Sequence, residues 1–91
     1  MVAKVAVLIR VFPESTETSL EELTDRIRNV LPSEYEIASR GEEPIAFGLK
    51  ALLLKILMPE DKEGGTSELE EVISKVEGVS QVEVIMVSRS Y

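Results

Sequence analysis

The sequence predicts one α+β domain in which two strand–helix–strand units follow each other, in the order βαββαβ. Three observations support this prediction. Apolar residues alternate near both ends of the chain with the period of a β-strand. Two segments combine the apolar spacing of amphipathic helices with capping residues. Residues 13–30 also align without a gap on residues 59–76, at an offset of 46, so the two units resemble each other.

The offset of 46 gives seven identical positions among eighteen. These pairs are Pro13/Pro59, Glu14/Glu60, Glu17/Glu63, Glu22/Glu68, Leu23/Leu69, Ile27/Ile73 and Val30/Val76. The similarity indicates either an internal duplication or two similar helices that follow similar loops. Under both interpretations the chain consists of two similar units.

The first unit begins with a strand, predicted from β-branched residues in alternate positions. These residues are Val5, Val7, Ile9 and Val11. A helix follows from Ser19, which has the capping-box spacing to Glu22, and it ends before Pro32. Its apolar stripe consists of Leu20, Leu23, Ile27, Val30 and Leu31. A shorter strand is predicted at residues 35–38.

The second unit begins with an ambiguous segment, residues 48–58. Its apolar residues Leu49, Leu52, Leu53 and Ile56 have helical spacing. The offset of 46 places residues 48–57 on the first strand, and a strand buried on both faces can lose its alternation. We therefore predict a strand.

The second helix is predicted to begin near Thr66 or Ser67, with Ser67 and Glu70 at capping-box spacing, and to end at Gly78. Its apolar stripe consists of Leu69, Val72, Ile73 and Val76. In the last strand, one face is predicted to carry Val82, Val84 and Met86, and the other Glu83, Ile85 and Val87. The complete order predicts a ferredoxin-like sandwich, a four-stranded antiparallel sheet with two helices on one face. Unrelated functions share this fold, so the fold does not decide the role.

Composition excludes several kinds of site. The chain has 91 residues, which suits a single domain over residues 1–91, and it contains no cysteine and no histidine. Disulfides, thiolate chemistry and the usual zinc sites are therefore excluded, and we predict no metal and no cofactor. The N-terminal apolar run is interrupted at Arg10 and Pro13, and the longest apolar stretch, ALLLKILM, is too short to span a membrane. We expect a cytoplasmic protein with no membrane partner.

The net charge is −7, which argues against direct nucleic-acid binding, because that requires clustered Lys and Arg. A basic protein partner fits better. An RNA-recognition domain with this element order would carry stacking aromatic residues on its central strands, where only Phe12 is found. An acylphosphatase would need an arginine and an asparagine at a phosphate-binding loop, whereas Arg10 lies in a predicted strand and Asn29 in a predicted helix.

Four segments together resemble the elongation factor 1-beta family in its short archaeal form. They are EEPIAFGLKALLLKI (42–56), PEDKEGGT, SELEEVISKVEG and VSQVEVIMVSRSY, and PIAFGLKAL is the most specific to the family. The resemblance covers essentially the whole chain. It implies a guanine nucleotide exchange factor, not an enzyme, that promotes release of GDP from the GTPase elongation factor 1-alpha so that GTP can bind. A single exchange domain that acts as a monomer is expected.

The resemblance also implies which residues carry the exchange. The family motif P-I/V-G-F/Y-G matches Pro44, Ile45 and Phe47, with Ala46 in place of the first motif glycine. The family's aromatic residue enters a hydrophobic pocket on the GTPase, which makes Phe47 the expected anchor. A basic residue near the C-terminus reaches toward the magnesium and phosphate site, and its position is matched by Arg89. The family's eukaryotic pattern has lysine there, and a guanidinium does not replace an ammonium freely.

Each of these residues also has an interpretation without function. Phe47 could be a core residue, Arg89 a solvated charge, and Lys50 a residue of the sheet edge instead of one that orients the phosphate region of the GTPase. The alternative function is a small-ligand-binding or regulatory domain of the ferredoxin-like type. Such a domain would change its melting temperature with a metabolite, whereas an exchange factor would respond only to its GTPase.

Overall fold

The computed structural model describes residues 4–59 and 66–90, with side chains as far as Ser88. The strands are β1 (Lys4–Pro13), β2 (Glu36–Pro44), β3 (Lys50–Pro59) and β4 (Val79–Ser90). The helices are α1 (Leu20–Val30) and α2 (Ser67–Ser74). The predicted order βαββαβ is confirmed.

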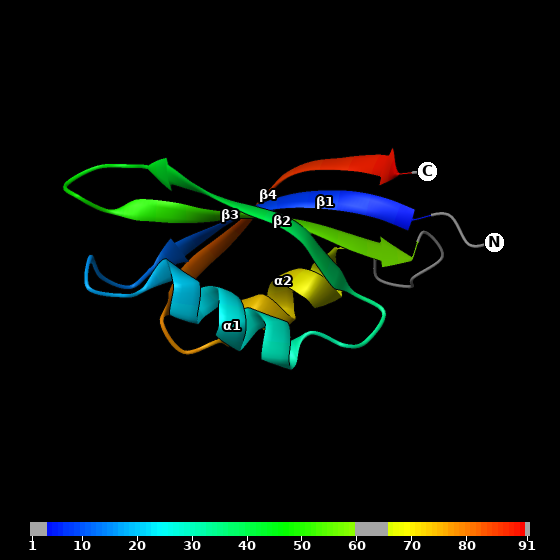
Figure 1. Ribbon diagram of the computed structural model, residues 1–91, viewed down its shortest axis with the longest axis horizontal. Helices are drawn as coiled ribbons and strands as arrows, with labels where there is room; N and C mark the ends of the chain where they lie inside the picture. The colour runs from blue at the N-terminus through cyan, green and yellow to red at the C-terminus, as the bar shows by residue number, and fades with distance from the viewer. Residues whose placement is uncertain (1–3, 60–65, 91) are drawn as a thin grey trace.

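The four strands form one antiparallel sheet in the order β2-β3-β1-β4. The inner strands are β1 and β3, while β2 and β4 form the edges. Both helices lie on the same face of this sheet, and the other face is left uncovered (Figure 1). The predicted ferredoxin-like sandwich is therefore confirmed.

The core lies between the helices and the covered face of the sheet. In β1, Val7, Ile9 and Val11 are fully buried, because alternate residues of a strand point to the same face. The helices add four buried apolar side chains, Leu23 and Ile27 from α1, and Leu69 and Ile73 from α2. The other core residues are Tyr35, Leu52, Leu54, Ile56, Met58, Val76 and Val79. Burial of these apolar side chains is the main force that holds the two layers together.

Helix α1 has the predicted start and end. The hydroxyl of Ser19 accepts a hydrogen bond from the backbone N–H of Glu22 (3.3 Å), which satisfies one of the free donors of the first turn. At the other end, the backbone N–H of Leu31 donates to the carbonyl of Ile27 (3.1 Å), and Pro32 follows. Proline cannot continue the helical hydrogen bonds, so the helix stops there.

Helix α2 begins where predicted, but its cap and its end differ from the prediction. Thr66 is its N-cap and Ser67 is already helical, so the predicted capping box of Ser67 and Glu70 is wrong. The helix ends at Ser74, four residues before Gly78. The Ser74 hydroxyl donates to the carbonyl of Glu71 (2.8 Å), a local bond that competes with continuation of the helix. Val76 remains buried because the turn after the helix directs it into the core.

The ambiguous segment forms a strand, as predicted, but only one face of β3 is fully covered. Leu52, Leu54 and Ile56 point into the core, whereas Lys55 is exposed on the opposite face. Pairing with β1 on one side and β2 on the other therefore overrides the helical spacing of its leucines. An inner position in the sheet satisfies the backbone of this segment on both sides.

The other strands differ in extent and register. β2 runs from Glu36 to Pro44, well beyond the predicted residues 35–38, and β3 pairs with it along this length. In β4, an irregularity at Ile85 shifts the register between the pairs Ile9–Val84 and Leu8–Met86. An extra residue moves the later side chains to the other face. Met86 therefore lies on the uncovered face with Leu8, and the predicted common face of Val82, Val84 and Met86 is wrong.

Candidate functional site

The PIAFG motif forms a tight hairpin that joins the edge strand β2 to the inner strand β3 and extends from one end of the sheet (Figure 1). The backbone N–H of Ile45 donates to the carbonyl of Leu49, and the N–H of Leu49 donates to the carbonyl of Ala46, both at 2.9 Å. The second bond closes a four-residue turn over residues 46–49. Two backbone bonds thus hold the motif in a defined shape.

Phe47 lies at the tip of this turn with its ring 97% exposed. Its φ is +52° and that of Gly48 is +80°, so both central residues of the turn are left-handed, as in a type I′ turn. Gly48 adopts this conformation without strain, whereas a residue with a Cβ loses about 1–2 kcal/mol there. Phe47 is the only non-glycine residue with positive φ in the part of the chain that the structure describes. A large apolar side chain in a strained position and without contacts contributes nothing evident to stability.

The residues beside Phe47 extend this exposed apolar tip. Ile45 is 43% exposed, and Pro44, the last residue of β2, is also exposed. Gly48 lies near the loop that joins β1 to α1, since a Cβ built on it would be 3.9 Å from Cγ2 of Thr16. The tip therefore presents a phenylalanine and an isoleucine next to a hydroxyl-bearing loop.

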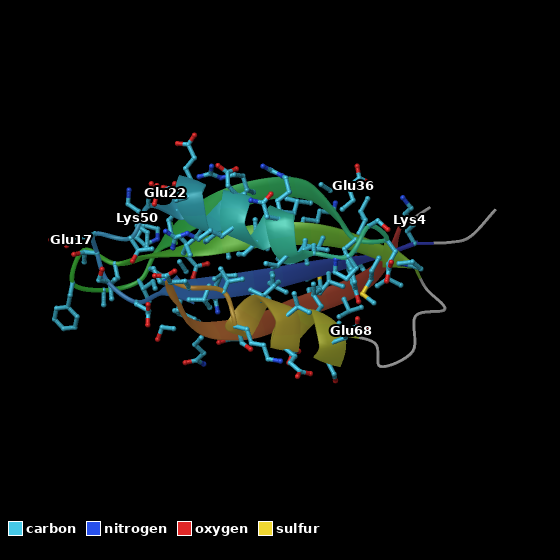
Figure 2. All side chains as sticks on the ribbon, turned by 90° about the horizontal axis from the view of Figure 1, so that it is seen from below. Lys4, Glu17, Glu22, Glu36, Lys50 and Glu68 are labelled. Carbon is cyan, nitrogen blue, oxygen red and sulfur yellow. The ribbon has the colours of Figure 1, made fainter. Side chains whose placement is uncertain are left out.

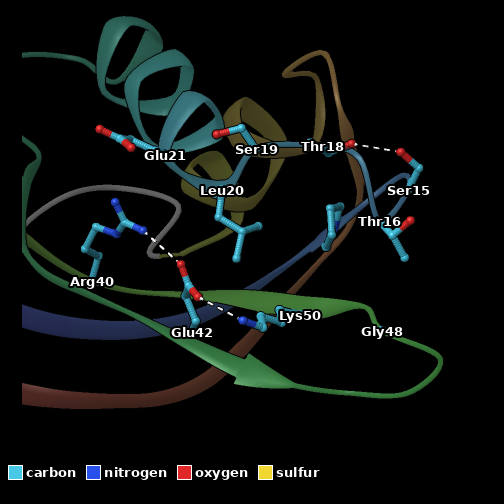
Figure 3. Close-up of a pocket in the computed structure, with 11 residues that line it drawn as sticks. Ser15, Thr16, Thr18, Ser19, Leu20, Glu21, Arg40, Glu42, Gly48 and Lys50 are labelled. Atoms are coloured by element: carbon cyan, nitrogen blue, oxygen red, sulfur yellow. Dashed lines mark hydrogen bonds and ion pairs between the residues drawn. The ribbon is translucent and has the colours of Figure 1, made fainter.

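Lys50 is the first residue of β3 and lies in a polar cleft behind the hairpin (Figure 3). Its Nζ is 3.8 Å from Oε1 of Glu42. The other carboxylate oxygen of Glu42, Oε2, binds Arg40 at 3.2 Å. The cleft has a volume of about 440 Å³, and hydroxyl groups of the 14–19 loop line its other side. Because β3 is an inner strand, Lys50 lies at one end of the sheet and not on an edge strand. Its charge is already shared with a carboxylate.

Arg89 lies near the C-terminal end of β4, where its backbone pairs with Val5, and its side chain is outside the described part of the structure. The hairpin lies beyond the other end of β1, past the pair Val11–Leu52. Val5 and Val11 are six positions apart along β1, a span of about 20 Å at strand spacing. The structure therefore does not bring Phe47 and the backbone of Arg89 together. They occupy opposite ends of the sheet.

Charged side chains surround both ends of the sheet. Glu17 and Lys50 lie at the hairpin end, while Lys4 and Glu36 lie at the opposite end (Figure 2). Lys4 and Glu36 form an ion pair at 3.8 Å. Within the described residues, no group of three or more acidic side chains is arranged to hold a metal ion. Neither described helix is long and apolar enough to cross a membrane.

Sequence reasoning missed a charged cluster on the uncovered face of the sheet. Arg10 of β1 binds Glu83 of β4 at 2.9 Å and Glu43 of β2 at 3.1 Å. The arginine side chain is 24% exposed, much less than an ordinary surface arginine. The signal in the sequence was an arginine in the middle of a strand otherwise rich in apolar residues, but its two partners could not be chosen without the strand order.

Comparisons with known proteins agree with this architecture. Residues 6–89 match the family model described as the EF-1 guanine nucleotide exchange domain. The chain is similar to elongation factor 1-beta of Desulfurococcus amylolyticus, with 60% identity over 96% of this chain and 97% of the relative. It is also similar to the elongation factors 1-beta of Staphylothermus marinus (59%; 96% and 97% covered) and Thermofilum pendens (56%; 96% and 96% covered).

Among solved structures, the fold is similar to the C-terminal domain of the MgtC protein from Mycobacterium tuberculosis. The TM-score is 0.56, with 98% of this chain and 88% of that chain covered. Sequence identity is 12%, so this likeness concerns the fold alone. The family match and the relatives carry the assignment: the chain belongs to the family of EF-1 guanine nucleotide exchange domains and is a nucleotide exchange factor of translation elongation.

Proposed function

We propose that the chain releases GDP from elongation factor 1-alpha by binding it at both ends of the sheet. Phe47 is the apolar anchor at one end, supported by Pro44 and Ile45. Arg89 is the basic group that acts at the phosphate and magnesium side of the nucleotide site. Lys50 assists at the hairpin end. One copy of the chain acts as a monomer in the cytoplasm.

The observation that carries this proposal is the state of Phe47. Its ring is almost fully exposed to water, and its backbone is left-handed. Both features lower the stability of the free chain. A pocket on a partner would remove the exposed apolar surface from water, and the closed hairpin loses little further freedom on binding. Aromatic residues that enter pockets are the usual energetic centres of protein interfaces.

Exchange of this kind requires no covalent chemistry from the chain. The factor must bind the nucleotide-free GTPase more tightly than the GDP-bound form, and by linkage it then weakens GDP binding by the same factor. A cation that competes with magnesium near the phosphates supplies such a difference, because the metal helps neutralise the nucleotide. The acidic surface, with net charge −7, favours contact with basic parts of the GTPase.

Because the two ends are far apart, we infer that they have different roles in exchange. Contacts at the hairpin add affinity for the GTPase in every nucleotide state, whereas a contact at the phosphate side distinguishes the states. Truncation of Phe47 should therefore raise the concentration of factor needed for exchange. Truncation of Arg89 should lower the maximal rate, because it removes a difference between states.

The test is release of a fluorescent GDP analogue from elongation factor 1-alpha at increasing factor concentration. We expect Phe47→Ala to raise the half-saturating concentration about 30-fold, which corresponds to about 2 kcal/mol for an anchor residue. Val30→Ala is the matched control, since Val30 is an exposed apolar residue on α1 away from the hairpin, and we expect it to behave as the unmodified chain. A folded Phe47→Ala variant with unchanged release would exclude the anchor.

The Phe47→Ala/Arg89→Ala double variant tests the two-ended arrangement. The two sites lie more than about 10 Å apart, so their effects on the free energy of exchange should add. Strong non-additivity would mean that the two residues act on a single element of the GTPase. Absence of release by the unmodified chain would remove the proposed partner.

A further inference from the structure

We propose that Arg10 is a positioning residue for exchange, which fixes the base of the Phe47 hairpin to the centre of the sheet through Glu43. The inference rests on the proposed role of Phe47. It concerns a residue far from the tip, on the uncovered face of an inner strand.

The placement of Arg10 makes this link possible. Its neighbours Ile9 and Val11 are fully buried against the helices, so the side chain of Arg10 points to the uncovered face. Arg10 pairs with Leu53 of β3 on one side and Glu83 of β4 on the other. The guanidinium extends across β3 to Glu43 on β2, and it thereby connects the two edge strands through a central one.

Glu43 is the residue through which Arg10 would act on the hairpin. It precedes Pro44, the last residue of β2, and its backbone pairs with Ala51. Arg10 Nη2 lies 3.1 Å from Oε1 and 3.3 Å from Oε2 of Glu43, so both carboxylate oxygens are within reach. In the described sheet, edge strand β2 has a partner strand on one side only. The link from Arg10 to Glu43 therefore adds a second, side-chain constraint next to the hairpin.

The cluster is poorly explained by stability alone. Nε of Arg10 is buried without a hydrogen-bond partner among the described residues, and a buried unpaired donor destabilises the folded state. Its two carboxylate partners are 41% and 47% exposed, so water can replace the arginine when it is removed. Because water screens the exposed carboxylates, each pair contributes on the order of 1 kcal/mol or less to folding. What the arginine does provide is a fixed connection between the hairpin base and β1.

A fixed hairpin lowers the entropic cost of binding, because Phe47 is then held ready for its pocket. Loss of the link leaves the ring and the C-terminal end of β4 unchanged, but a smaller fraction of molecules holds the hairpin in the binding geometry. Such a loss weakens apparent affinity by that fraction and leaves the bound state as it was. The expected signature is a change in half-saturating concentration with an unchanged maximal rate.

Two carboxylates on one arginine provide a matched pair of variants. Glu43→Gln cuts the link to the hairpin, and Glu83→Gln cuts the link to β4, which does not carry the hairpin. In the GDP-release assay, we expect Glu43→Gln and Arg10→Met to raise the half-saturating concentration about threefold to tenfold, with the maximal rate unchanged. We expect Glu83→Gln to change it less than about twofold, while both carboxylate variants lower the melting temperature by no more than about 5 °C.

A variant that combines Glu43→Gln with Phe47→Ala separates positioning from general stability. If Arg10 and Glu43 act through the ring, Glu43→Gln has no further effect once the ring is removed. Three outcomes would each overturn the inference. Glu43→Gln and Glu83→Gln could have equal effects, Glu43→Gln could have no effect, or Glu43→Gln could keep its full effect in the Phe47→Ala background. A loss with Phe47→Ala but none with Glu43→Gln refutes the positioning role alone. Full release by Phe47→Ala refutes the proposed anchor, and the positioning role falls with it.

Discussion

The two halves of the chain, residues 4–44 and 50–90, contain the same elements in the same order. Their helices correspond more closely than their strands do. The inner strands Lys4–Pro13 and Lys50–Pro59 are related by the offset of 46 found in the sequence. The helices agree at their central apolar positions, since Leu23 and Ile27 of α1 correspond to Leu69 and Ile73 of α2, and all four are buried. The repeated pair at their C-terminal ends differs, because Val30 is exposed and Val76 is buried. The repeat therefore describes the packing of the helices.

The strands do not agree in this way. In β1 the odd-numbered residues point to the helices, whereas in β3 the even-numbered residues do, for example Ile9 and Leu54. An even offset cannot relate these faces, because side chains alternate along a strand. Helix faces therefore obey the sequence repeat, while strand faces are set by pairing within the sheet.

The halves also differ beyond their last strand. The first half continues into the hairpin, where a large residue is held exposed in a left-handed conformation. The second half contains no described turn of this kind, and its one left-handed residue among those described is Gly78, which is buried. Within residues 4–59 and 66–90, a left-handed non-glycine residue is thus found only at the proposed site, in keeping with the cost that such residues carry.

The most severe loss of stability should come from variants that test whether the two helices are equivalent. Ile27→Ala and Ile73→Ala each remove a fully buried side chain at corresponding positions. We expect each variant to lose about 2–4 kcal/mol of unfolding free energy, because a cavity replaces the lost apolar contacts. Denaturant unfolding measures both values. A loss below about 1 kcal/mol for one helix alone would show that the halves are not energetically equivalent.

A smaller effect compares the left-handed glycines of the two halves. In Gly78→Ala, the new Cβ would lie 3.0 Å from Nη1 of Arg26 and 3.1 Å from Cδ2 of Leu23, at a φ of +97°. We expect a loss of about 2–3 kcal/mol from backbone strain and crowding. Gly48→Ala has the strain without the crowding, since its nearest neighbour is 3.9 Å away, and should lose about 1 kcal/mol. Equal losses in thermal unfolding would argue against a contribution from crowding.

The mildest variants concern the helix caps. Ser19 binds the N–H of Glu22, whereas Thr66 makes no side-chain bond to the backbone of α2. We expect Ser19→Ala to lose about 1 kcal/mol of unfolding free energy and Thr66→Ala to lose less than about 0.5 kcal/mol. Urea unfolding of both variants provides the measurement. The reverse order would mean that the interaction of Thr66 with Glu70 stabilises α2 more than a backbone cap does.

Much of the fold followed from local sequence features. Helix α1 was predicted from its cap, apolar stripe and terminal proline. The structure confirms the cap and the end, and it buries Leu23 and Ile27 of the stripe but leaves Val30 exposed. The second helix was predicted less well. Gly78 suggested the end of the helix, but the helix ends at Ser74, where the Ser74 hydroxyl bonds the carbonyl of Glu71. Residues 39–44 were not predicted as strand, since SRGEEP has little β-propensity and is held in β2 by its pairing with β3.

The candidate site, too, was predictable from the sequence only in part. The motif that contains Phe47 could be selected from the sequence because its resemblance to the exchange family is specific. The separation of Phe47 from Arg89 could not, since it depends on the direction in which β4 runs along β1. The connection from Arg10 to Glu43 joins residues 33 positions apart and requires the strand order.

Local sequence was sufficient to identify both helices with most of their core faces, the first and last strands, and the motif at the hairpin, because these depend on neighbours within a few residues. Assembly of the sheet was needed to establish which strand faces are buried, that the hairpin and Arg89 lie at opposite ends, and which carboxylates Arg10 binds. Those features arise from pairing between distant segments, and a shift of one residue in a strand reverses every later side chain.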